Sequence, residues 1–122
     1  MEGYSEIEIR VVCANRFIGA ISVNGRKYFS YEGRTGWIER SDSGHLFYHN
    51  EWNQKRIYIS RYGPYKGFHH GGTLHSVVAG LVRFIQAGER MKASFFDAKH
   101  WAYGDKAMNA VIRAGVRLGI LE

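Results

Sequence analysis

Hydrophobic and polar positions alternate along the first part of the chain. The apolar members of the first run are Ile7, Ile9, Val11 and Cys13, and the polar members are Glu6, Glu8 and Arg10. A period of two is typical of a β-strand that is buried on one face. The pattern therefore predicts a strand over residues 7–13, with Cys13 facing the core.

Turn-forming residues predict further strands after the first one. Asn24-Gly25 separates Phe17–Val23 from Arg26–Tyr31, and this dipeptide readily adopts the positive φ angles of a type I′ hairpin. A second hairpin is expected to join Trp37–Arg40 to His45–His49 through Ser41 to Gly44, and a last strand is expected over Lys55–Tyr62. About five short strands in succession, from about Ser5 to Tyr62, predict an antiparallel sheet.

The period changes to a helical one after Gly72. Apolar residues recur at helical spacing at Leu74, Val77, Val78, Leu81, Phe84 and Ile85. They predict a helix over Thr73–Ala87, with Thr73 as N-cap and Gly88 as C-cap. A last helix is predicted over Lys106–Leu118, with Asp105 as its N-cap and Gly119 as the residue that ends it. The expected fold is α+β: an N-terminal antiparallel β-sheet followed by two C-terminal α-helices, in a single domain over residues 1–122.

The positive charge of the chain is concentrated in one window. The 122 residues carry a formal net charge of +6, and no Asp or Glu occurs between Trp52 and Gly88. That window holds the cations Lys55, Arg56, Arg61, Lys66 and Arg83, interleaved with aromatic residues and glycines. Such a composition favours an anionic, ring-bearing partner, a nucleotide or a nucleic acid. One cysteine and no long apolar run favour a cytoplasmic protein without a membrane span.

Two segments supply the candidate ligand contacts. Four polar residues of the last helix follow one another at spacings of three or four residues and share one face: Lys106, Asn109, Arg113 and Arg117. A bound phosphate would offset the repulsion between the cations of this face. The glycine-rich start of the preceding helix is a ready anion site, and the loop before it adds Tyr65, Lys66 and His70. Trp101 is the candidate pocket wall.

Binding is favoured over catalysis. The histidines have no ligand companions at metal spacing, so neither a metal nor a cofactor is expected. A nuclease could use His70 or His75 as a base, but no carboxylate lies within 18 residues of His70 on either side. The first helix is apolar on more than one side, because Ala79, Gly80 and Val82 lie off its main stripe. Either the last helix or a second copy of the protein covers this side, and the small residues favour a homo-oligomer.

The predicted order of a meander and two helices, with Arg113 and Arg117 paired on the last one, resembles the Thoeris anti-defence 1 family of small phage proteins. The resemblance implies a homo-oligomer in the infected bacterial host that sequesters a cyclic ADP-ribose immune signal without cleaving it. Some members also hold cyclic oligonucleotides. It implies that Arg113 and Arg117 contact phosphate. The alternative is a basic nucleic-acid-binding module that coats DNA or RNA, and an enzyme acting on nucleotides ranks third.

Overall fold

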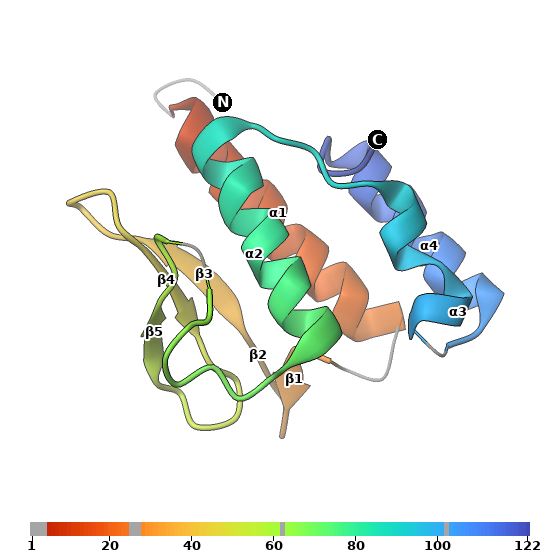
Figure 1. Ribbon diagram of the computed structural model, residues 1–122, viewed down its shortest axis with the longest axis horizontal. Helices are drawn as coiled ribbons and strands as arrows, with labels where there is room; N and C mark the ends of the chain where they lie inside the picture. The colour runs from red at the N-terminus through yellow and green to blue at the C-terminus, as the bar shows by residue number, and fades with distance from the viewer. Residues whose placement is uncertain (1–4, 25–27, 62, 102) are drawn as a thin grey trace.

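The N-terminal segment is a helix. The computed structural model describes residues 5–24, 28–61, 63–101 and 103–122, and α1 spans Glu6–Asn24 (Figure 1). The predicted strand over residues 7–13 and the predicted hairpin between Phe17 and Tyr31 are therefore wrong. Asn24 ends α1, and residues 25–27 lie outside the described residues. The expected fold class is wrong for the same reason, because a helix comes first, then two small sheets, then further helices.

A capping box and a helical stripe explain why α1 forms. The Ser5 hydroxyl accepts the Glu8 N–H at 3.1 Å and donates to the Glu8 carboxylate at 3.3 Å. This Ser-x-x-Glu arrangement satisfies a backbone donor at a helix N-terminus. The fully buried apolar residues of α1 are spaced by three or four: Ala14, Phe17, Ile18 and Ile21. This stripe outweighs the alternation in residues 7–13, where the apolar side chains are only partly buried.

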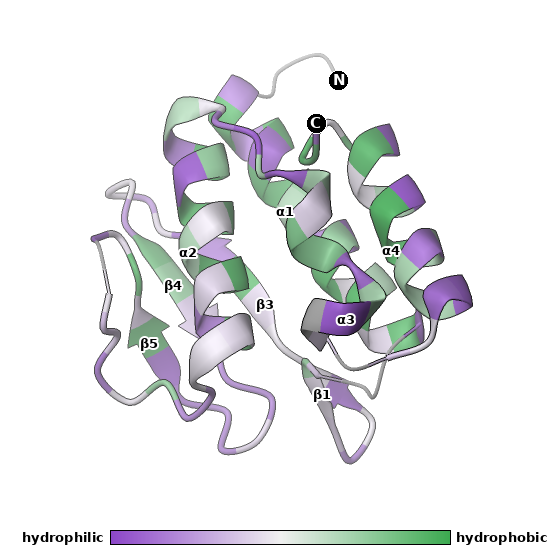
Figure 2. Cartoon of the chain, turned by 45° about the vertical axis from the view of Figure 1, so that its right-hand side comes forward, coloured by the Kyte–Doolittle hydropathy of each residue, from purple (hydrophilic) through white to green (hydrophobic). Residues whose placement is uncertain are grey.

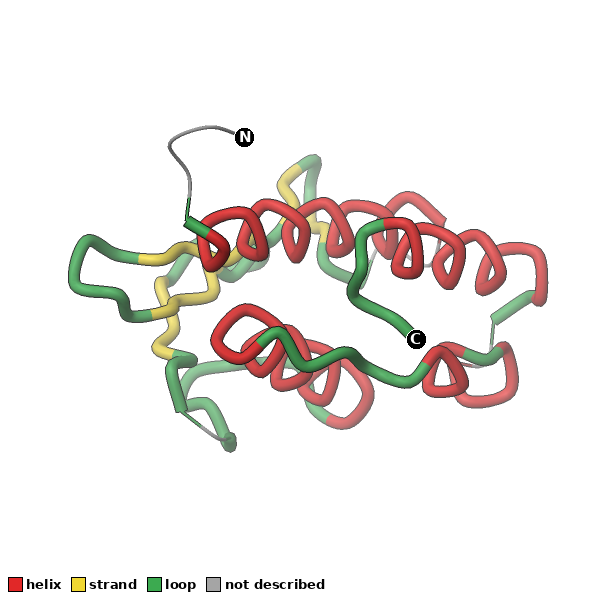
Figure 3. The backbone as a smooth tube through the Cα atoms, turned by 90° about the horizontal axis from the view of Figure 1, so that it is seen from above, coloured by secondary structure: helices red, strands yellow, loops and turns green. Residues whose placement is uncertain are grey.

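Two small antiparallel sheets follow α1. In the first, β1 (Ser30–Tyr31) pairs with β2 (Arg34–Thr35). The second has the strand order β3 (Trp37–Arg40), β4 (Leu46–His49) and β5 (Arg56–Tyr58), at one end of the molecule (Figure 3). The predicted hairpin between Trp37 and His49 is confirmed. The predicted strand Lys55–Tyr62 is shortened to β5, and Tyr62 lies outside the described residues.

The two predicted C-terminal helices are present as α2 (Gly72–Ala87) and α4 (Asp105–Arg117), with the short helices η1 (Ala93–Phe96) and α3 (Ala98–Trp101) between them. Gly88 is the predicted C-cap, with φ 72° and its N–H on the Phe84 carbonyl. The predicted N-caps are wrong: Gly71 and Gly104 hold these positions, and neither makes a side-chain capping bond. No helix among the described residues is long and apolar enough to cross a membrane.

Helix α1 is the centre of the core, because it contacts β3, α2 and α4. Two of its polar side chains join it to the other layers. The Asn15 amide accepts the Ile38 N–H and donates to the Ile38 carbonyl, at 2.6 and 2.9 Å, and so satisfies the free edge of β3. Arg10 donates to the Ile85 carbonyl near the end of α2 at 2.8 Å. The hydrophilic residues of α4 lie on the side away from α1 (Figure 2).

The apolar circumference of α2 is covered by the chain itself. Seven residues of this helix are buried: Val77, Val78, Gly80, Leu81, Val82, Phe84 and Ile85. Gly80 lies against Met91 of the following segment, so an added Cβ would lie 2.2 Å from the Met91 sulfur. Of the residues that motivated the homo-oligomer, Gly80 and Val82 are thus buried within one chain and Ala79 is partly exposed, and self-association stays a prediction.

We expect Gly115→Ala to destabilise the fold by about 1 to 3 kcal/mol, because its Cβ would lie 2.5 Å from Leu121 and 2.9 Å from Phe17. The matched control is Gly19→Ala in α1, where no atom lies within 4 Å, and it should stabilise the helix by up to about 1 kcal/mol. Urea denaturation measures both. Equal effects of the two variants would contradict close packing of α1 against α4.

Candidate nucleic-acid interface

The turn between β4 and β5 directs one side chain into the core and the next out of it. Asn50 organises this turn, since its side-chain oxygen accepts the Trp52 N–H at 2.8 Å and its own N–H reaches the Lys55 carbonyl at 2.9 Å. Glu51 is consequently buried, with 3% of its surface exposed, whereas Trp52 is 52% exposed. An acceptor inside and an aromatic ring outside therefore come from adjacent residues.

Arg34 on β2 lies beside this turn with its guanidinium held by backbone. Its Nε donates to the Glu51 carbonyl at 3.2 Å, and an Nη reaches the Trp52 carbonyl at 3.4 Å. The guanidinium carbon is 5.8 Å from the centre of the Tyr31 ring. Among the described residues Arg34 forms no ion pair. Its position is fixed by neutral groups, so its charge remains available to an anion.

Two hollows beside this turn share Glu51 in their linings, and Arg34 lines the first of them. The first, of about 350 Å³, is lined by Arg34, Thr35, Trp37, His49, Asn50, Glu51 and Gln54. The second, of about 280 Å³, is lined by Ser30, Tyr31, Glu51, Trp52, His69 and His70. Their aromatic walls are exposed, with Trp37 at 46% and Tyr31 at 40%. We call Tyr31, Arg34, Trp37, Trp52 and His69 the Arg34 surface.

The rings of this surface are fixed by their neighbours. Trp37 stacks on His49 with centroids 4.0 Å apart and planes within 3° of parallel. Trp52 makes edge-to-face contacts with Tyr31 at 6.3 Å and with His69 at 5.4 Å. Rigid, exposed rings beside a cation are the usual platform for stacking nucleobases.

A buried carboxylate forms the floor of both hollows. Glu51 accepts the Tyr48 hydroxyl at 2.5 Å and the His70 Nε2 hydrogen at 2.6 Å. Burial acts to raise the pKa of Glu51, but the hydrogen bonds from His70 and Tyr48 outweigh it and hold this pKa below its usual value. Burial and the nearby Glu51 charge raise the pKa of Tyr48, so Tyr48 stays a hydrogen-bond donor. This network joins the end of β4 to the loop before α2.

The predicted ligand residues fall into separate regions. Lys106, Asn109, Arg113 and Arg117 are exposed along the outer side of α4. The loop between β5 and α2 lies at the opposite side of the molecule in Figure 1, so α4 and the loop do not form one pocket. Within the loop, Lys66 is exposed, Tyr65 is buried and stacked on His75, and His70 lines the second hollow.

Trp101, the predicted pocket wall, belongs to the core. It is 5% exposed, stacks on Phe96 at 5.4 Å, and donates its indole N–H to the Phe95 carbonyl at 3.0 Å. The sequence interpretation omitted Tyr31, Arg34, Trp37, Glu51 and Trp52. One available signal was Trp37 itself, which alternates with buried Ile38 and so falls on the polar face of its strand.

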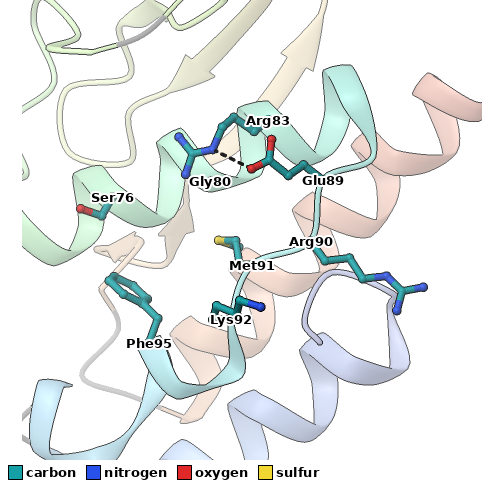
Figure 4. Close-up of a pocket in the computed structure, with 8 residues that line it drawn as sticks. All are labelled: Ser76, Gly80, Arg83, Glu89, Arg90, Met91, Lys92 and Phe95. Atoms are coloured by element: carbon teal, nitrogen blue, oxygen red, sulfur yellow. Dashed lines mark ion pairs between the residues drawn. The ribbon is translucent and has the colours of Figure 1, made fainter.

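A further cleft, of about 370 Å³, lies between α2 and the segment before η1 (Figure 4). Arg83 is its central cation, with its Nε 3.9 Å from the Glu89 carboxylate. Lys92 points away from Arg83 in Figure 4 and pairs with Glu122 at 2.7 Å. Arg83 and Lys92 therefore have carboxylate neighbours, Arg90 also lines the cleft, and its ring, Phe95, is only partly exposed.

A sequence model of the family YoqU matches residues 5–122. The chain belongs to the YoqU family. No curated protein and no solved structure matches it. Nothing in these comparisons links the chain to the Thoeris anti-defence 1 family, so that resemblance stays a prediction.

We expect Glu51→Gln to cost about 2 kcal/mol of stability at neutral pH, because it weakens two buried hydrogen bonds to a charge. The folded pKa of Glu51 is lowered, so its stabilisation is present above about pH 4.3 and is lost as the pH falls through the folded pKa. Urea denaturation at several pH values should show an acid-dependent loss in the parent that is smaller in Glu51→Gln. The exposed control Glu89→Gln should follow the parent; equal acid dependence in Glu51→Gln would contradict the network.

Proposed function

We propose that this YoqU-family chain binds single-stranded nucleic acid at the Arg34 surface. The observation that carries the proposal is a guanidinium fixed by two backbone carbonyls, with no ion pair in the described residues, among the exposed rings of Tyr31, Trp37 and Trp52. A phosphate would pair with the guanidinium, and bases would stack on the rings. Base stacking on an aromatic side chain contributes about 1 to 3 kcal/mol per base.

The position of Arg34 favours a strand over a single nucleotide. Arg34 lines the first hollow and contacts Tyr31, Glu51 and Trp52, which line the second. Two consecutive bases, one in each hollow, would therefore have the phosphate that joins them at Arg34. A single strand offers such bases, whereas a duplex keeps its bases stacked inside. Capture of a small cyclic nucleotide, as the Thoeris resemblance implies, is the competing proposal.

Trp52→Leu and Arg34→Gln should each weaken binding of a labelled single-stranded oligonucleotide of about 12 residues by roughly tenfold, because each removes about 1.4 kcal/mol. Fluorescence anisotropy measures the affinity at about 50 and 200 mM salt. The matched controls are Tyr58→Leu, which removes an exposed ring on β5, and Arg113→Gln, which removes an exposed cation on α4.

Both controls should bind within about twofold of the parent. Equal affinity of Trp52→Leu and the parent, or a larger loss in Arg113→Gln, would contradict the proposal. A cyclic ADP-ribose that binds while the oligonucleotide does not would favour the competing one.

A further inference from the structure

The two adjacent histidines of the second hollow have hydrogen bonds that fix different tautomers. His69 is exposed, and the His70 side chain is 26% exposed. Both line the hollow beside Tyr31 and Trp52. Stacking of a base uses the rings of Tyr31 and Trp52 and does not require two histidines in the same hollow.

His70 is oriented as a proton acceptor. An ionised carboxylate can only accept, so the 2.6 Å contact with Glu51 places the ring proton on Nε2. Nδ1 then carries a lone pair, and it has no hydrogen-bond partner among the described residues. Edge-to-face contacts with Phe68 at 5.4 Å and Phe29 at 6.5 Å fix the plane of the ring. A carboxylate behind a histidine also stabilises the imidazolium that forms when Nδ1 takes a proton.

His69 is oriented as a donor. The Asn53 side-chain oxygen accepts the Lys55 N–H at 3.0 Å, which directs the Asn53 amide nitrogen to His69 Nε2, also at 3.0 Å. His69 Nε2 therefore accepts, and in the neutral ring the proton lies on Nδ1. The residues that line the hollow thus supply an acceptor nitrogen on His70 and a donor on His69, and the Arg34 guanidinium is bound to the carbonyls of Glu51 and Trp52, which also line it.

We propose that the second hollow cleaves RNA by transesterification at the 2′-hydroxyl. This inference rests on the proposed binding of a single strand. His70 Nδ1 takes the proton of the 2′-hydroxyl, and the 2′-oxygen forms a bond to the adjacent phosphorus while the bond from phosphorus to the 5′-oxygen breaks. Water protonates the departing 5′-oxygen and takes the proton from His70. The products are a 2′,3′-cyclic phosphate and a 5′-hydroxyl, with no change of oxidation state.

The remaining residues have supporting parts in this step. Arg34 and the His69 N–H stabilise the negative charge that develops on the phosphate oxygens. Glu51 is a positioning residue, because it acts through His70. DNA lacks the 2′-hydroxyl, so it binds at the same surface without being cut.

The substrate for the test is a DNA strand of about 12 residues that contains one ribonucleotide, incubated with the purified chain in EDTA. Denaturing electrophoresis and mass spectrometry should find a 2′,3′-cyclic phosphate and a 5′-hydroxyl at that position.

His70→Gln keeps an N–H for Glu51 but lacks the base, and it should lower the cleavage rate at least about a hundredfold. The control His45→Gln changes an exposed histidine elsewhere and should leave the rate unchanged. Glu51→Gln should lower kcat by at least about tenfold while KM stays within about twofold of the parent, because the imidazolium loses its carboxylate but the binding surface is kept.

Binding without cleavage overturns this inference and leaves the proposed function standing, whereas absence of binding overturns both. Cleavage by His70→Gln at the parent rate also overturns it. A substrate with a 2′-O-methyl group at the single ribose tests the step without any variant, and its cleavage would contradict attack by the 2′-hydroxyl even if His70→Gln fails to fold.

Discussion

The Glu51 carboxylate joins two parts of the chain that are distant in the sequence. It lies in the turn that follows β4, and it accepts one hydrogen bond from Tyr48 on β4 and one from the loop that precedes α2. Because a buried carboxylate without donors is costly, the Tyr48 hydroxyl and the His70 ring must both stay in place. Their positions then determine where the second hollow opens and which nitrogen of His70 is available.

The outer surface depends on the same turn. Trp52 follows the buried Glu51 and is exposed, and the carbonyls of both residues hold Arg34. Close packing limits the alternatives: a Cβ at Gly36 would lie within 2.0 Å of the Tyr48 hydroxyl, so the chain before β3 passes directly over that ring. The exposed rings and the cation are therefore arranged by the buried network beneath them.

Local signals predicted part of this fold. The helices α2 and α4 and the hairpin of β3 and β4 follow from periodicity and turn residues, which act over a few neighbours. Helix α1 was predicted as strands because residues 7–13 fit both the period of a strand and the period of a helix. The helix is specified by the capping residues Ser5 and Glu8 and by a buried apolar stripe at helical spacing: Ala14, Phe17, Ile18 and Ile21. The pair of Glu51 and His70 could not be found this way, because 19 residues separate the two side chains that meet at 2.6 Å.

The central claim is that the Arg34 surface, and not the basic face of α4, contacts a single strand of nucleic acid. The most direct test is a two-dimensional NMR titration of isotope-labelled protein with a short single-stranded DNA, which lacks the 2′-hydroxyl and stays intact. The account predicts that the side-chain signals of Arg34, Trp37 and Trp52 shift or broaden first, while the backbone amides of Arg113 and Arg117 stay unchanged. Shifts centred on α4, with unchanged indole signals of Trp37 and Trp52, would contradict it.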